Sequence, residues 1–119
     1  MGNPDQPALP PDAAISMALD RMWERHRSQI LERVAVLEAA ALAVAANHLS
    51  ASDREAAHAA AHKLAGTLGM FNLTRSTDVA REIELMYFKE SALLAASGQQ
   101  LAAMAAELRT MIEDRKSNR

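Results

Sequence analysis

Apolar residues recur along most of this chain at intervals of three and four, which is the spacing of one face of a helix. In the first half of the chain the recurring positions are Ile15, Leu19, Met22, Ile30, Val34, Leu37, Ala41 and Val44. Three further segments, over about 52–71, 73–87 and 97–115, have the same spacing. The pattern predicts an all-α protein with four main helices.

Capping residues indicate where these helices begin. Asp12 follows a stretch that holds all four prolines, and it can accept hydrogen bonds from the first turn of a helix that begins at Ala13. The second and the last helix are each expected to begin with a capping box, in which a serine and a Glu or Gln three residues later satisfy each other's free amides. The two pairs are Ser52 with Glu55 and Ser97 with Gln100.

The connections between the predicted helices are short, so sequential helices must run antiparallel. The expected fold is therefore an antiparallel up-and-down four-helix bundle. An unbroken helix over 13–46 would be about 50 Å long, which is more than its neighbours could cover, so we expect a bend near residues 17–23 and a short extra N-terminal helix. The predicted organisation is a disordered proline-rich leader over 1–11, the bundle over 12–115 and a frayed tail over 116–119.

Composition and charge narrow the possible functions. The chain has no cysteine, which excludes disulfides and thiolate metal sites. Its basic residues are dispersed and its net charge is -2, so we expect none of the basic surface that nucleic-acid binding requires. No apolar stretch is long enough to span a bilayer, and no secretory signal is visible. We therefore expect a cytoplasmic monomer that binds neither nucleic acid nor membrane.

Residues 57–73, AHAAAHKLAGTLGMFNL, combine a helical core stripe with residues that weaken helices. His62 lies about 140° from the centre of the stripe and should project into solvent. A glycine inside a helix costs about 1 kcal/mol relative to alanine, so Gly66 and Gly69 together weaken the segment by roughly 2 kcal/mol. The stripe that is predicted to face the core consists of Ala57, Ala61, Leu64, Leu68 and Phe71.

The residues around His62 are unusually small. Its predicted neighbours are His58, Ala59, Ala65 and Gly66, with Gly69 a turn further along. The imidazole is thus expected to stand above a low patch of helix surface, and we interpret the glycines as clearance for another macromolecule that approaches the ring. The alternative is a histidine that is merely solvated, which is the more common situation for a single histidine in an alanine-rich helix.

Residues 61–84, AHKLAGTLGMFNLTRSTDVAREIE, resemble the signature of histidine-containing phosphotransfer (HPt) domains of two-component phosphorelays. The matching positions are His62, Gly66, Gly69, Leu73, Ala80, Ile83 and Glu84. These domains are four-helix bundles, often with a short extra N-terminal helix. Many members carry a lysine three residues after the histidine, where this chain has Ala65, and the nearby lysine here is Lys63.

The resemblance implies a phosphorelay intermediate. His62 would accept a phosphoryl group from the aspartate of a receiver domain and pass it to another receiver, with response regulators and a hybrid histidine kinase as partners. Neutral imidazole is a nucleophile, and a histidine with the ordinary pKa of about 6.5 is mostly neutral at pH 7. Lys63 would support the phosphoryl group electrostatically. The partner-binding surface would be formed by His58, Ala59, Ala65, Gly66 and Gly69.

The resemblance also implies that the receiver supplies Mg²⁺, so we expect no cofactor in this chain. The sequence contains no phosphate-binding glycine loop and no kinase ATP motif, so we expect no ATP-dependent kinase activity. Two other functions stay open. One is a bundle that binds or scaffolds receivers without phosphotransfer. The other is a metal-binding bundle, although Glu55 and His58, with His62 one turn further on, form only one Glu-x-x-His motif where a di-iron site needs two.

Overall fold

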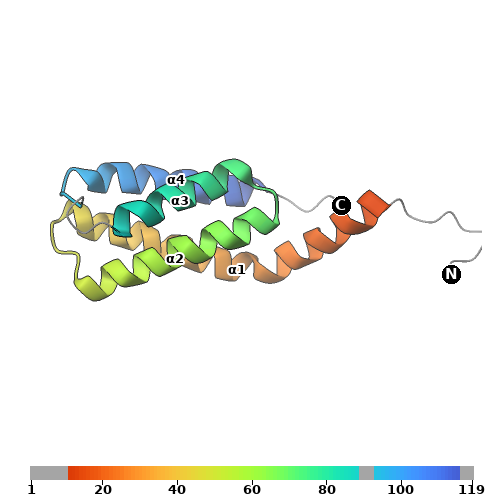
Figure 1. Ribbon diagram of the computed structural model, residues 1–119, viewed down its shortest axis with the longest axis horizontal. Coiled ribbons are helices and arrows are strands. Elements are labelled where there is room, and N and C mark those ends of the chain that lie inside the picture. Colours follow the sequence, from red (N-terminus) through yellow and green to blue (C-terminus); the bar gives the residue numbers. More distant parts are fainter. Residues whose placement is uncertain (1–10, 89–92, 116–119) are drawn as a thin grey trace, which may run out of the picture.

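The computed structural model describes residues 11–88 and 93–115 of the chain. This part forms four helices and no strand: α1 (Pro11–Ala45), α2 (Ala51–Met70), α3 (Thr74–Phe88) and α4 (Ser97–Asp114). The helices run up and down in one bundle, in which α1 lies beside α4 and α2 beside α3 (Figure 1). The predicted all-α four-helix bundle is confirmed. The tail predicted over 116–119 and all of the predicted leader except Pro11 lie outside the described residues.

The first helix differs from the sequence-based prediction. α1 is one continuous helix, so the predicted separate short N-terminal helix is wrong. α1 nevertheless changes direction along its length, and its N-terminal part turns away from the bundle (Figure 1). No glycine interrupts this segment, and its proline is Pro11 in the first turn, where a missing amide breaks no hydrogen bond. The first turns of α1 instead project beyond the other helices (Figure 1), which leaves Ile15 and Met17 exposed. None of the described helices is long and apolar enough to cross a membrane.

Both predicted capping boxes are wrong. α2 is capped two residues earlier than predicted, by Ser50, whose hydroxyl accepts a hydrogen bond of 3.0 Å from the amide of Asp53. This serine and this acidic residue also lie three apart, and the charge of Asp53 in the first turn complements the helix dipole. α4 is preceded by Ala96, which supplies no side-chain cap, and Ser97 is the first residue of the helix.

The core is formed by one stripe of each helix. The stripe predicted over 57–71 is buried at every position, and the aromatic side chains of Trp23, Phe71 and Tyr87 are buried as well. Trp23 and Phe71 pack edge to face with ring centroids 5.1 Å apart, and the guanidinium of Arg115 lies 4.8 Å from the Trp23 ring centroid. These aromatic and cation–π contacts close the end of the bundle at which α2 connects to α3.

A close approach and an ion pair fix α4 against α1. A Cβ atom at Gly98 would lie 2.6 Å from the backbone nitrogen and Cα of Ala45, so glycine is required at this crossing. Further along, Arg109 donates hydrogen bonds of 2.8 and 2.7 Å to the two carboxylate oxygens of Glu38. These bonds hold the pKa of Glu38 below its ordinary value.

Tyr87 is expected to make stability fall in alkaline solution. Its buried hydroxyl has no hydrogen-bond partner among the described residues, and burial raises the pKa of Tyr87 to about 12. Because tyrosine in an unfolded chain ionises near pH 10, the free energy of unfolding should decrease as the pH rises from about 10 to about 12. Tyr87→Phe should lack this part of the decrease and be at least as stable at neutral pH, since it removes an unpaired hydroxyl.

Urea unfolding of the natural chain and of Tyr87→Phe, at a series of pH values, measures this difference. Lysine and arginine titrations contribute equally to both chains, so the difference between the two curves isolates the tyrosine. If the free energies of unfolding of the two chains differed by the same amount at every pH up to about 12, burial would not raise the pKa of Tyr87.

Candidate functional site

His62 lies on the outer face of α2. The residues that share its helix on the opposite side, such as Ala61, Leu64 and Leu68, are buried, whereas the imidazole side chain is 71% exposed. The prediction that His62 projects into solvent is therefore confirmed. An exposed ring on a rigid helix can meet a second protein with little rearrangement of its own bundle.

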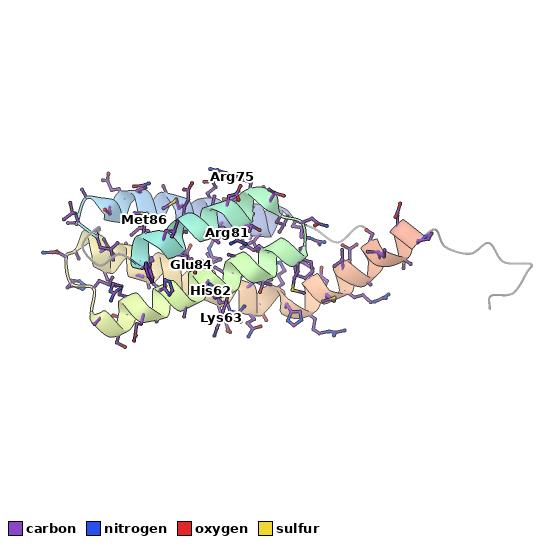
Figure 2. All side chains as sticks on the ribbon, viewed as in Figure 1. His62, Lys63, Arg75, Arg81, Glu84 and Met86 are labelled. Carbon is purple, nitrogen blue, oxygen red and sulfur yellow. The ribbon has the colours of Figure 1, made fainter. Side chains whose placement is uncertain are left out.

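A glutamate from the neighbouring helix holds the imidazole in place. Nδ1 of His62 lies 2.7 Å from Oε2 of Glu84 on α3, and Figure 2 shows the two side chains coming from adjacent helices. A neutral ring that keeps its proton on Nδ1 donates this hydrogen bond. Nε2 then carries the lone pair and is the nucleophilic nitrogen.

Glu84 matches the family signature, but the sequence alone predicted no role for it. A signal for the contact is nevertheless present in the sequence, because His62 and Glu84 are equally far from Leu73 in the short connection between α2 and α3. In an antiparallel helix pair with a tight turn, residues equally distant from the turn lie at the same level along the two helix axes. This symmetry could have identified Glu84 as the partner of His62.

A second histidine and two apolar residues border the site. His58, one turn before His62, has Nε2 3.8 Å from Oε2 of Glu84, and its ring lies against Phe88 with centroids 5.7 Å apart. A shallow depression on this surface is lined by His58, Ala59, His62, Glu84, Leu85 and Phe88. Leu85 and Phe88 are 61% and 64% exposed, and neither was predicted from the sequence to border the site.

The glycines after His62 leave open space outside the bundle. A Cβ atom at Gly66 would have nothing within 4 Å, and at Gly69 it would meet only the side chain of Thr77, at 3.8 Å or more. Neither glycine is therefore required by packing within the described bundle. The two glycines thus leave room for a partner on the surface beside His62.

Ala65 is placed differently from the prediction. It is only 4% exposed and packs in the core, so it contributes no surface beside His62. A residue three positions after His62 lies about 60° around the helix toward α3, whereas Gly66, four positions after it, lies about 40° in the other direction. Ala59 and Lys63 are exposed as expected, and Lys63 makes no hydrogen bond or ion pair with the described residues.

The metal-binding alternative gains no support from these positions. The carboxylate that lies beside both histidines belongs to Glu84, and not to the predicted Glu55. Among residues 11–88 and 93–115, no group of three or more His, Asp or Glu side chains is arranged to hold a metal ion.

Comparison with known proteins identifies the class to which this bundle belongs. Residues 21–118 match the Hpt domain family, so the chain is a member of that family and the resemblance seen in the sequence is confirmed. Hpt domains act in phosphotransfer in two-component phosphorelays and interact with response regulators and kinases. The first ten residues of α1 precede the matched region.

One curated relative is Protein RcaC of Microchaete diplosiphon, which is 36% identical to this chain over 66 residues. The alignment covers 56% of this chain but only 10% of RcaC, so the chain corresponds to a small part of that protein. No solved structure matches the chain significantly.

Proposed function

We propose that this domain accepts a phosphoryl group on Nε2 of His62 from the phosphoaspartate of one receiver domain and passes it to the aspartate of another. The observation that carries the proposal is the 2.7 Å contact between Nδ1 of His62 and Glu84, combined with the exposure of the ring. The contact leaves Nε2 as the free nucleophile, and the exposure makes it available to another protein.

The contact with Glu84 suits each step of the transfer. The lone pair of Nε2 attacks phosphorus, an N–P bond forms as the P–O bond to aspartate breaks, and the aspartate leaves as a carboxylate. Because Nδ1 keeps its proton, the phosphorylated ring is positively charged, and the carboxylate of Glu84 stabilises that charge. The reverse steps return the phosphoryl group to a second aspartate and restore the neutral ring.

The proposed partners are response-regulator receivers and a hybrid histidine kinase. The receiver would supply Mg²⁺ for the reaction, and this chain would supply the nucleophile without using ATP. We further propose that it acts in the cytoplasm as a monomer.

Sequential transfer between purified proteins tests the proposal. A receiver carrying labelled phosphoaspartate is mixed with this chain, freed of small molecules, and a second receiver is then added. The expected result is an acid-labile, base-stable label on this chain that moves on to the second receiver. A chain that binds phosphorylated receivers but never acquires label would instead be the scaffolding bundle, and the relay role would be refuted.

Gly66→Leu is expected to slow transfer while the bundle becomes slightly more stable. Leucine is the better helix former by up to about 1 kcal/mol, but its side chain would fill the space beside His62 and hold the receiver away, at an expected cost of about 10- to 100-fold in rate. Ala35→Leu, at an exposed position of α1, is the matched control and should leave the transfer rate unchanged. Equal rates for Gly66→Leu and the natural chain would show that the glycine does not provide clearance.

A further inference from the structure

The arginines of α2, α3 and α4, and Arg115 directly after α4, differ in whether they form hydrogen bonds or ion pairs within the bundle. Arg54 donates a hydrogen bond to the backbone oxygen of Tyr87, and Arg75, Arg109 and Arg115 form ion pairs with Glu107, Glu38 and Asp20, respectively. Arg81, an exposed residue of α3, makes no hydrogen bond or ion pair with any described residue. Its positive charge is therefore available to a ligand.

Two contacts between α2 and α3 define where Arg81 lies. Glu84 reaches His62, and Thr77 lies opposite Gly69, where a Cβ atom would be 3.8 Å from its hydroxyl. Arg81 is four residues after Thr77 and three before Glu84, so all three lie along the edge of α3 that borders α2. Figure 2 shows Arg81 on the same helix as Glu84, beside the α2 segment that carries His62.

The space next to Arg81 is open. The residues of α2 that follow His62 on the side of α3 are small, since Ala65 carries only a methyl group and Gly69 has no side chain. An arginine side chain is long enough to extend across one helical turn, and neither Ala65 nor Gly69 carries a side chain large enough to block it. The guanidinium can therefore reach the solvent side of His62, where Nε2 is free.

The charge of a phosphoryl group makes a cation necessary at this position. A phosphoryl group on Nε2 would bring about two negative charges into the neighbourhood of Glu84, whose carboxylate is itself 2.7 Å from the ring. Residue 65, three positions after His62, is a buried alanine and supplies no charge. Lys63 lies about 100° around α2 from His62, on the side away from α3. Arg81 is therefore the residue that can supply a positive charge on the side of the ring next to Glu84.

We propose that Arg81 binds the phosphoryl oxygens on His62 and offsets their repulsion by Glu84. This inference rests on the proposed function, since it assigns a phosphoryl ligand to the same site. The planar guanidinium suits two phosphoryl oxygens at once, which lysine would contact only as a point charge. Arg81 thereby stabilises both the transfer step and the phosphohistidine that results.

The test uses two phosphoryl donors, a phosphorylated receiver and the small molecule phosphoramidate, and the variants Arg81→Gln and Arg81→Lys. Arg81→Gln is expected to reduce the phosphorylation rate about tenfold or more with both donors and to shorten the lifetime of the phosphohistidine. Arg81→Lys should recover part of each loss. Arg21→Gln, at an exposed arginine near the projecting end of α1, is the matched control and should behave like the natural chain.

Two results would overturn the inference. Arg81→Gln could match the natural chain with both donors, or it could be slower only with the receiver, in which case Arg81 contacts the partner protein and not the phosphoryl group. In both results the natural chain is still phosphorylated on His62, so the proposed function is unaffected. A natural chain that takes up no phosphoryl group on His62 from either donor would refute the proposed function, and the role of Arg81 with it.

Discussion

Replacing His62 with glutamine is expected to abolish phosphoryl acceptance and leave the fold intact. The side chain is 71% exposed, so the core is unchanged, and the glutamine amide can still donate a hydrogen bond to Glu84. We expect the free energy of unfolding to stay within about 0.5 kcal/mol of that of the natural chain, as is usual at surface positions. The amide has no nucleophilic lone pair comparable to that of Nε2, so label from a phosphorylated receiver should fall to background.

His58→Gln is the matched control for this variant. His58 is the other histidine beside Glu84, with Nε2 3.8 Å from the same carboxylate oxygen. It should retain most of the transfer rate, because the contact between His62 and Glu84 persists without it. If His62→Gln still accepted label, or if His58→Gln lost it, the phosphoacceptor would have been assigned to the wrong histidine.

Substitutions of Glu84 should produce the second largest effect. Glu84→Ala removes both the hydrogen bond to Nδ1 and the negative charge, so the ring is no longer oriented and its cation is no longer stabilised. A hydrogen bond to a charged group is worth about 1.5–3 kcal/mol, which corresponds to about a 10- to 100-fold slower transfer. Glu84→Gln keeps an acceptor oxygen but not the charge, so we expect its rate to lie between those of alanine and the natural residue.

The rates of single-turnover transfer from a phosphorylated receiver measure this series. Glu82→Ala removes an exposed glutamate from the same helix and controls for the change in overall charge. It should transfer at the natural rate. A Glu84→Ala variant that also transferred at the natural rate would show that the contact seen in the structure does not assist the reaction.

The fold was largely predictable because helix periodicity and short connections have few solutions. The core stripe of α2, which ends at Phe71, followed from spacing alone. The unbroken α1 did not, because the prediction assumed that every turn must be covered, whereas a helix without an internal glycine or proline can project past its neighbours. The N-cap of α2 was predicted at Ser52 and lies at Ser50. Both serines suit an N-cap, and the choice between them depends on the conformation of the connection that precedes the helix.

The site was only partly predictable. The exposure of His62 depends on angles within one helix, which the sequence specifies, and the same angles place Ala65 closer to the core stripe, where it is buried. The contact of His62 with Glu84 and the position of Arg81 depend on how two helices are aligned. The apolar border formed by Leu85 and Phe88 also belongs to α3 and becomes visible only when the two helices are placed together.

The most direct test of the account is to determine which nitrogen carries the phosphoryl group. The chain is labelled with ¹⁵N-histidine, phosphorylated by a receiver and examined by NMR for coupling between phosphorus and each ring nitrogen. The account predicts that in the free chain His62 holds its proton on Nδ1 and that the phosphoryl group is attached to Nε2 of this residue. Attachment to Nδ1, or to any other histidine, would contradict it.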